Sequence, residues 1–536
     1  MDVAEKEPGM DLNWDFPYPS QRMPVFARNV VAASQPLAAQ AGVQMLARSG
    51  NAVDAALAAA ITLTVVEPTS NGIGSDAFAI VWDGKELHGL NGSGRSPLAW
   101  SAERFAGLGR MPQFGWDAVT VPGAVDAWSA LSRRFGKLPF ADLFEPAIRY
   151  AADGFIVSPI TANKWSMTPD RYRDFPAFAK TFLPGGRAPL PGEHFRPAGL
   201  AGALKAIAET GGESLYRGEL AERIVSFARQ TGGALAAEDL AEHHSEWVRT
   251  LSQTWRGITL HELPPNGQGL AVLIALGILK QLDIESCPVD SPDSLHLQIE
   301  AMKAAFAEAG RHIADPAWMT LEPSALLDEG LLKERAHSIS MDRASLPIPV
   351  IPPDGGTVYL TAADDNGMMV SFIQSNYEGF GSGIVIPGTG ISLQNRGAGF
   401  TLEAGHPNCV AGGKRPFHTI IPGFVMKDGA PLMSFGVMGA HMQAQGHLQM
   451  MIRIFSYGQN PQAAADAPRW YVAQDSRLSL EPGFCPTIRE ELQRRGHLLT
   501  PDAPTSLFGG AQLIYRLQKG YCAASDPRKD GQAVGF

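Results

Sequence analysis

Cysteine is scarce in this sequence, and its few occurrences are scattered. The four cysteines are Cys287, Cys409, Cys485 and Cys522, and none stands at the short spacing of a metal-binding or redox motif. The sequence therefore gives no support to a disulfide scaffold or a cysteine metal site. We expect the four thiols to be reduced and mostly structural.

Long apolar segments are also missing. The longest apolar run, residues 55–66, is too short to span a bilayer. Residues 1–8 are acidic on balance and lack the apolar core of a secretory signal. We therefore predict a cytoplasmic protein without a membrane partner.

No block of like charge occurs. The sequence has 44 basic and 54 acidic residues, a formal net charge of −10, and neither sign forms a long run. This distribution argues against nucleic acid as a partner. The 13 histidines show no HExxH motif or other paired-ligand spacing, so we predict neither a metal site nor a cofactor.

What the sequence does have is an ordinary globular composition with readable local patterns. Hydrophobic residues make up 45% of the chain and charged residues 18%, which provides for a large core. The predicted elements are helices over 37–47 and 52–63, a hairpin of strands 78–82 and 87–90, and an amphipathic helix through 295–306. These patterns alone indicate an α/β or α+β fold.

The most informative stretch begins at Thr357. A proline-rich run over 345–356 cannot be a regular helix or a central strand, and it ends in two glycines. Two strand-like runs follow, 357–364 and 368–375, with an Asn-Gly pair between them. An Asn-Gly pair in this position predicts a β-hairpin, so Thr357 opens its first strand.

A threonine in this place could be a nucleophile. If the Gly356–Thr357 bond breaks, Thr357 carries a hydroxyl and a free α-amine, and the amine can accept the hydroxyl proton. An unperturbed α-amine has a pKa of about 7.7–8.0, so a useful fraction is neutral near neutral pH. The alternative is a β-branched residue that simply starts a strand.

Several motifs carry a resemblance to a known family. They are GNAVDAA at 50–56, VEP at 66–68, VPG at 121–123, GTVYLTAADDNG at 356–367, PGTGI at 387–391 and AASDPR at 523–528. In this order the motifs resemble the γ-glutamyltransferase superfamily of N-terminal-nucleophile hydrolases, across nearly the whole chain. The resemblance implies an α+β fold, a four-layer αββα sandwich.

The resemblance also implies two subunits cut from one precursor. Residues 1–356 would be the large subunit and residues 357–536 the small subunit, with Gly356 and Thr357 flanking the cleaved bond. Both subunits would contribute strands to one fold. A homodimer of such heterodimers is compatible with the family.

The family's site residues carry over to this chain one by one. Thr357 is the nucleophile, and Ser375 stands where the family has a hydroxyl that bonds the nucleophile. Gly439 and Ala440 stand where the family has two glycines whose N–H groups bind the oxyanion, just before a helical stripe through 448–455. Arg95 matches the arginine that binds the substrate carboxylate. The plainer alternatives are a strand-end serine, a small-residue turn and a surface arginine.

Departures from the family pattern point to the substrate. His418 and Thr419 replace two carboxylate-binding serines, and Tyr377, Arg396 and Gly399 stand where the family holds the glutamyl ammonium. A tyrosine, a cation and a glycine cannot form an acidic clamp for an ammonium group. The carboxylate end of the site is therefore expected to persist and the amine end to be lost. His418 could donate to the carboxylate, or it could be a buried histidine bonded within the protein.

Three segments resemble one branch of the family most. They are QNRGAGF at 394–400, GHPN at 405–408 and KRPFHT at 414–419. That branch includes oxamate amidohydrolase of purine (allantoin) breakdown, whose substrate has a carboxylate beside its amide and no amino group.

We therefore predict an autoprocessing N-terminal-threonine amidohydrolase that releases ammonia from a small carboxylate-bearing amide through an acyl-enzyme. The alternatives are a γ-glutamyltransferase or glutathione hydrolase, a glutaryl-type acylase, and an uncleaved protein that only binds carboxylates.

Overall fold

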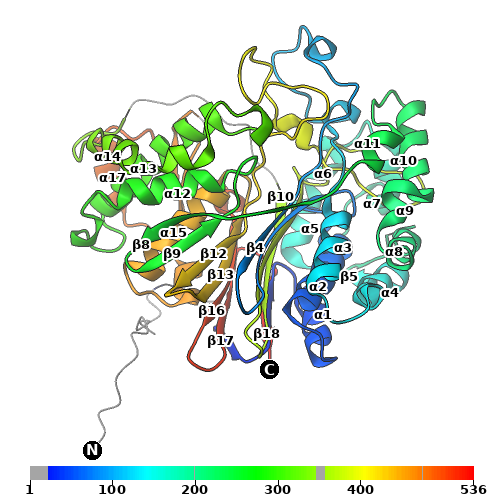
Figure 1. Ribbon diagram of the computed structural model, residues 1–536, viewed down its shortest axis with the longest axis horizontal. Coiled ribbons are helices and arrows are strands. Elements are labelled where there is room, and N and C mark those ends of the chain that lie inside the picture. Colours follow the sequence, from blue (N-terminus) through cyan, green and yellow to red (C-terminus); the bar gives the residue numbers. More distant parts are fainter. Residues whose placement is uncertain (1–17, 19–21, 198, 346–355, 474, 502) are drawn as a thin grey trace, which may run out of the picture.

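The computed structural model describes residues 18, 22–197, 199–345, 356–473, 475–501 and 503–536. Within these residues two seven-stranded antiparallel sheets pack face to face, and helices cover the outer face of each sheet (Figure 1). The four-layer αββα sandwich predicted from the family resemblance is therefore confirmed.

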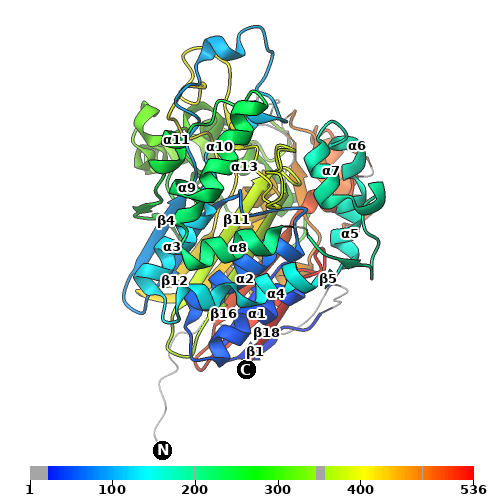
Figure 2. The same cartoon turned by 90° about the vertical axis from the view of Figure 1, so that its right-hand side faces the viewer.

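Sheet A contains the predicted Thr357 hairpin. In spatial order its strands are β18 Gln532–Gly535, β2 Val30–Ala33, β10 Gly356–Ala363, β11 Met369–Tyr377, β3 Asp76–Trp82, β4 Leu87–Gly92 and β7 Glu246–Val248. The helices beside it are α1 Pro36–Ala47, α2 Ala52–Val66, α3 Ala124–Phe135, α4 Glu145–Asp153 and α8 Leu200–Glu209, which face the viewer in Figure 2. The shorter helices of this half are α5 Pro159–Ser166, α6 Thr168–Arg171, α7 Pro176–Phe182, α9 Glu213–Arg217, α10 Glu219–Gln230 and α11 Ala237–Ala241.

Sheet B forms the second inner layer. Its strands are β1 Val25–Ala27, β17 Tyr521–Ser525, β16 Gly510–Arg516, β13 Ala430–Met438, β12 Gly423–Lys427, β9 Ile258–Glu262 and β8 Leu251–Trp255. Its helices are α12 Gly269–Leu279, α13 Pro292–His312, α14 Glu329–His337, α15 Met442–Phe455, α16 Pro461–Asp466 and α17 Pro486–Arg494. Two small two-stranded sheets pair β14 Trp470–Val472 with β15 Leu478–Leu480, and β5 Phe155–Ile156 with β6 His194–Phe195.

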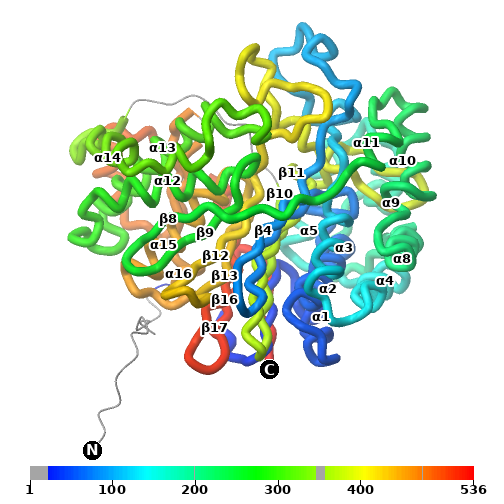
Figure 3. The backbone as a smooth tube through the Cα atoms, viewed as in Figure 1, coloured from blue at the N-terminus to red at the C-terminus, as the bar shows by residue number. Residues whose placement is uncertain are grey.

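Residues before and after Gly356 contribute strands to both sheets. In sheet A the strands β10 and β11 lie between β2 and β3, which come from the first part of the chain. Figure 3 shows this interleaving as neighbouring segments of distant colours. A cut after residue 356 would therefore leave two pieces that share both sheets.

The two-residue period of β10 decides which way its side chains point. Val358, Leu360 and Ala362 pack in the core between sheet A and its helices, whereas Tyr359 and Ala363 pack in the core between the sheets. Thr357 has the same parity as Tyr359, although the pairing with β11 shifts register between Gly356 and Val358. The alternation therefore directs the side chain of Thr357 toward the inter-sheet side.

The local predictions agree with the structure at most positions. Both predicted helices near the start of the chain exist as α1 and α2, and Asn51 caps α2 in a reciprocal bond with Asp54. Both hairpins and the long amphipathic helix, α13, are also confirmed. The proline-rich run over 346–355 lies outside the described residues. In the described part of the chain, no helix has both the length and the apolar character needed to cross a bilayer.

Candidate active site

Thr357 lies at the start of β10 with its hydroxyl in a buried network. The residue is only 2% exposed. Its Oγ1 donates to Ser375 Oγ at 3.2 Å and accepts from Gln443 Nε2 at 3.3 Å. Ser375 comes from the neighbouring strand β11, and Gln443 comes from the first turn of α15 on sheet B. The hydroxyl is therefore held by a strand of sheet A and by a helix that packs on sheet B.

Ser375 connects the Thr357 hydroxyl to the peptide bond before it. Its Oγ accepts from the Tyr377 N–H at 2.7 Å and donates to the Gly356 carbonyl oxygen at 2.7 Å. Because Tyr377 and Thr357 both donate to Ser375, the single proton of Ser375 is directed to the Gly356 oxygen. The bond that would be cleaved is thus polarised by a hydroxyl relay that begins at the proposed nucleophile. The predicted contact between Thr357 and Ser375 is present.

Gln443 is a site residue that the sequence analysis missed. Its Oε1 accepts the N–H of Ile421 at 3.0 Å, which turns the amide NH₂ toward Thr357. Three residues earlier in the chain is Ala440, so the start of α15 lies beside Thr357. The partial positive charge of a helix N-terminus favours negative charge that develops there.

Gly439 and Ala440 lie in the backbone turn that leads into α15, as the sequence predicts. Their φ angles are +125° and +49°. A left-handed alanine costs roughly 1–2 kcal/mol, and Gln268 Nε2 supports the turn by donating to the Ala440 carbonyl at 2.9 Å. Among the described residues, no hydrogen bond from either N–H is found. Both groups are therefore available for an oxyanion.

Arg396 stands in a second buried part of the site. It begins η8 (Arg396–Gly399), is 1% exposed, and packs its guanidinium 4.7 Å above the ring of Tyr377. Its Nη1 donates to Thr419 Oγ1 at 2.8 Å. Burial lowers the pKa of Arg396 to about 10, so the group stays protonated at neutral pH. Thr419 and Tyr377, both predicted to bind substrate, here hold the arginine.

Asp76 and His418 form a fully buried pair next to the hairpin. Asp76 is the cross-strand partner of Ser375, and its Oδ2 lies 3.1 Å from His418 Nε2. The Ile420 N–H donates to His418 Nδ1 at 3.4 Å, so Nε2 carries the ring proton and donates to Asp76. Burial raises the pKa of Asp76 to about 7 and lowers the pKa of His418 well below its ordinary value. Both ring nitrogens are engaged, so direct donation from His418 to a substrate stays a prediction that requires the Asp76 bond to break.

Arg95 follows Gly94, whose N–H bonds Asp76, but the guanidinium of Arg95 is paired with other carboxylates. Its Nη1 is 2.9 Å from Asp315 Oδ2 and its Nη2 is 3.3 Å from Glu246 Oε1. Its side chain is 40% exposed and lines a hollow of about 150 Å³ together with Arg415. The predicted role of Arg95 as carboxylate receptor stays a prediction, and two protein carboxylates compete for its guanidinium.

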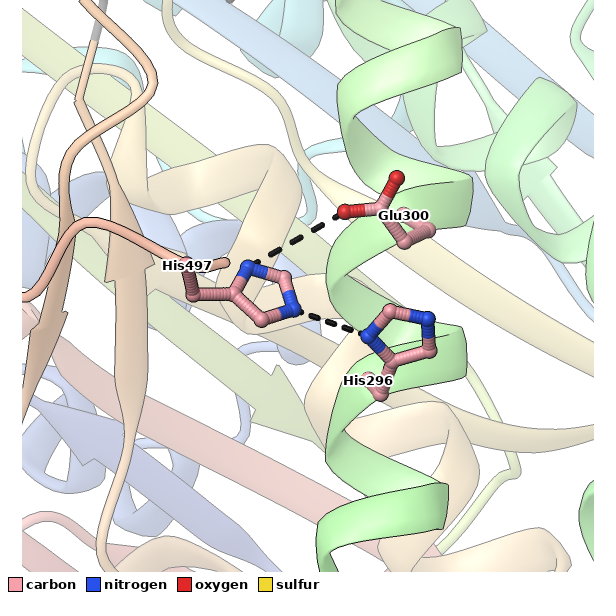
Figure 4. A group of neighbouring side chains, drawn as sticks. All are labelled: His296, Glu300 and His497. Carbon is pink, nitrogen blue, oxygen red and sulfur yellow. Dashed lines mark hydrogen bonds and ion pairs between the residues drawn. The ribbon is translucent and has the colours of Figure 1, made fainter. Parts of the chain in front are cut away.

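One group of potential metal ligands lies away from Thr357. His296, Glu300 and His497 are buried, and one ligand atom of each lies within 4.8 Å of the others (Figure 4). His296 Nδ1 and His497 Nε2 share a hydrogen bond of 2.8 Å, and the Lys303 ammonium is 2.9 Å from Glu300 Oε1. An ion would have to displace that ammonium, so these residues read as an internal polar network. We call His296, Glu300, Lys303 and His497 the anchor cluster, and the groups around Thr357 the Thr357 site.

The chain is similar to several known proteins. The family model described as Gamma-glutamyltranspeptidase matches residues 38–536. The chain is 36% identical over 519 residues to the glutathione hydrolase-like YwrD proenzyme of Bacillus subtilis (strain 168), covering 95% of this chain and 98% of that protein. It is 35% identical over 527 residues to the oxamate amidohydrolase proenzyme of Klebsiella pneumoniae subsp. pneumoniae, covering 96% and 99%. The crystal structure of cephalosporin acylase from Bacillus halodurans matches with a TM-score of 0.93 at 47% identity, covering 98% of this chain and 99% of that one.

Proposed function

We propose a substrate class and residue roles for this chain, which belongs to the gamma-glutamyltranspeptidase family and is a hydrolase that acts on amides. The proposal is a self-processing amidohydrolase whose nucleophile is Thr357 and whose substrate is a small amide that bears a carboxylate. The observation that carries it is the buried relay from the Thr357 hydroxyl through Ser375 to the Gly356 carbonyl oxygen.

Self-processing follows from that relay. Thr357 Oγ1 attacks the Gly356 carbonyl carbon while its proton passes to Ser375, and the Ser375 proton passes to the carbonyl oxygen. The C–N bond then breaks, the threonine nitrogen takes a proton, and Gly356 is left as an ester on Oγ1. Water hydrolyses the ester and frees the Thr357 hydroxyl and α-amine. The products are the subunits 1–356 and 357–536.

Turnover uses the same atoms on an external amide. Thr357 Oγ1 attacks the amide carbon, and the α-amine takes the hydroxyl proton. The N–H groups of Gly439 and Ala440 stabilise the oxyanion, with the N-terminus of α15 behind them. The proton moves from the amine to the leaving nitrogen, and ammonia departs from an acyl-enzyme. Water, activated by the same amine, then releases the acid.

The substrate class follows from the charges near Thr357. An ammonium group would meet the guanidinium of Arg396, and Gly399 offers no side chain in its place, which disfavours γ-glutamyl donors. Similarity to an oxamate amidohydrolase makes oxamate the first candidate. Similarity to a cephalosporin acylase structure supports a second candidate, amides with a longer acidic acyl group such as glutaryl.

A direct assay tests the function. Purified protein should show two bands on a denaturing gel and should release ammonia from oxamate faster than from neutral amides of similar size. Fast turnover of γ-glutamyl-p-nitroanilide that a dipeptide acceptor accelerates would instead identify a transferase. A single band of about 57 kDa without activity would contradict the proposal.

A further inference from the structure

Arg396 is the buried charge in the Thr357 site that lacks a counter-ion. It is one of the largest fully buried side chains of the protein. Among the described residues no carboxylate oxygen lies within ion-pair distance of its guanidinium, and its Nε and Nη2 have no hydrogen-bond partner. A buried cation without a partner is costly, so a site that keeps one is built for a group that the protein itself does not supply.

The free atoms of Arg396 form one edge of the guanidinium. Thr419 Oγ1 holds Nη1, and the Tyr377 ring covers one face of the plane. The Nε–H bond and the nearer N–H bond of Nη2 are parallel and lie in the guanidinium plane. That edge matches the two oxygens of a carboxylate, which it can bind with two parallel hydrogen bonds.

The acidic groups near Arg396 are engaged elsewhere. Both oxygens of Asp76 accept hydrogen bonds, Oδ1 from the N–H groups of Gly94 and Gly123 and Oδ2 from His418. Glu378, the other carboxylate nearby, forms a short ion pair with Arg171. Neither therefore closes the free edge of the guanidinium.

We propose that Arg396 is the carboxylate receptor of the Thr357 site and that its Nε–Nη2 edge binds the carboxylate of the amide substrate. This inference rests on the proposed function and names the group that selects the substrate. It assigns to Arg396 the role that the family resemblance gives to Arg95, whose guanidinium is paired with Asp315 and Glu246. Arg396 also lies close to the nucleophile, because the N–H of Tyr377 beneath it bonds Ser375, which bonds Thr357.

Kinetics of two variants test the receptor. Arg396→Lys keeps the charge but loses the two-pronged edge, and Arg396→Gln loses both. We expect kcat/KM for oxamate to fall about 10- to 100-fold in each variant, mainly through a rise in KM, because a charge-assisted pair of hydrogen bonds is lost. Turnover of a neutral amide such as acetamide should fall much less than turnover of oxamate, because acetamide has no carboxylate for Arg396 to bind.

A matched control is Arg453→Lys. Arg453 is also buried and lies 5.4 Å from the ring of Tyr18, but its Nη2 pairs with Asp290 at 2.6 Å. This variant should keep the KM for oxamate. An unchanged KM in Arg396→Lys, together with a raised KM in Arg95→Lys, would overturn the inference.

Binding without turnover separates the receptor from the proposed function. Oxalate, titrated calorimetrically into the mature protein, should bind the wild type and lose affinity in both Arg396 variants. If no amide is hydrolysed but oxalate binding still depends on Arg396, the function is wrong and the receptor stands. If oxamate is hydrolysed and Arg396 changes neither KM nor oxalate affinity, the receptor is wrong and the function stands.

A crystal structure of the wild type with oxalate covers the case in which the variants do not fold. A carboxylate on the Nε–Nη2 edge of Arg396 supports the inference. A carboxylate bound to Arg95, with the edge of Arg396 empty, overturns it.

Discussion

Two buried polar regions of this molecule differ in whether the protein itself supplies partners for their charged and polar groups. The Thr357 site and the anchor cluster both place histidine and carboxylate groups away from water. In the anchor cluster the charges have protein partners. In the Thr357 site a guanidinium edge and two backbone N–H groups have none among the described residues.

The anchor cluster bonds internally and to residues 340–345. Glu300 accepts from the Lys303 ammonium at 2.9 Å and from the Ser345 N–H at 2.9 Å, and Lys303 donates to the Ser345 carbonyl at 2.8 Å. His296 Nε2 bonds the Ser340 carbonyl at 2.7 Å. The cluster therefore fixes residues 340–345 to α13, and its work is structural.

The difference teaches how to separate structural from functional burial here. A network that is satisfied internally adds rigidity, whereas buried groups without partners add cost unless a ligand completes them. By this criterion the groups near Thr357 that lack partners within the described part of the chain are the Nε–Nη2 edge of Arg396 and the N–H groups of Gly439 and Ala440. Other buried arginines with one unbonded nitrogen, such as Arg469 and Arg495, are paired with a carboxylate. Histidine and carboxylate side chains alone would not have distinguished the two regions.

The largest effect is expected from removing the proposed nucleophile of the Thr357 site. Thr357→Ala leaves no hydroxyl to attack Gly356 or a substrate, so self-cleavage and amide hydrolysis should both be lost, a fall on the order of 10⁴-fold or more. A denaturing gel and an ammonia assay measure the two losses. Thr357→Ser keeps an oxygen nucleophile and should still cleave. An active two-chain Thr357→Ala protein would falsify the mechanism.

The second effect concerns the relay. Ser375→Ala removes the donor to the Gly356 carbonyl and the acceptor of the Thr357 proton, so self-cleavage should slow about 10²- to 10³-fold. The cleavage half-time on a gel measures it. The matched control is Ser371→Ala on the same strand, whose hydroxyl bonds Tyr359 and the Phe435 carbonyl between the sheets. Equal half-times in the two variants would remove Ser375 from the chemistry.

A smaller effect is expected at Gln443. Gln443→Leu removes one neutral hydrogen bond to Thr357 Oγ1, and kcat for amide hydrolysis should fall about 3- to 10-fold with KM little changed. The control is Gln445→Leu on the same helix, whose amide bonds the Val472 carbonyl at 3.1 Å and not Thr357. That control should lower the Tm and leave kcat unchanged. If Gln443→Leu instead lowers the Tm and leaves kcat unchanged, Gln443 acts only in packing.

Much of the fold was readable from local patterns. The Asn-Gly pair and the alternating runs predicted the β10–β11 hairpin, and Ser49-Gly50-Asn51 marked the break between α1 and α2. Sheet order could not be predicted, because β2 pairs with β18 on one side and with β10 on the other, and the three strands come from distant parts of the chain. Only the family resemblance supplied the four layers.

The sequence predicted the contact of the site that lies within one hairpin, but not the contact between that hairpin and a helix of the other half of the fold. Thr357 and Ser375 belong to one hairpin, so their contact followed from strand geometry. Gln443 reaches Thr357 only because the first turn of α15, a helix that packs on β13 of sheet B, lies beside the start of β10 in sheet A, and no local pattern encodes this approach. The sequence showed that Arg396 departs from the family pattern. It could not show that the guanidinium edge of Arg396 lacks partners among the described residues while Arg95 is paired with carboxylates, because these states depend on burial and on residues distant in the chain.

The smallest expected effect concerns the anchor cluster and the change of protein stability with pH. Burial lowers the pKa of His497 to about 4, below the value of about 6.5 for an exposed histidine. The unfolded chain then binds the proton more tightly, so the stability from this group is complete above about pH 6.5 and is lost as pH falls toward 4. In His497→Gln, an amide can still donate to His296, and this pH dependence disappears.

The comparison to make is therefore the Tm of His497→Gln and of the wild type between pH 8 and pH 5. We expect the wild type to lose on the order of 1 kcal/mol more stability than the variant over this range, so that their Tm values converge at low pH. Parallel profiles of Tm against pH for wild type and His497→Gln would mean that the anchor cluster accepts a proton without loss of stability. The proposed energetic contrast between the anchor cluster and the Thr357 site would then be wrong.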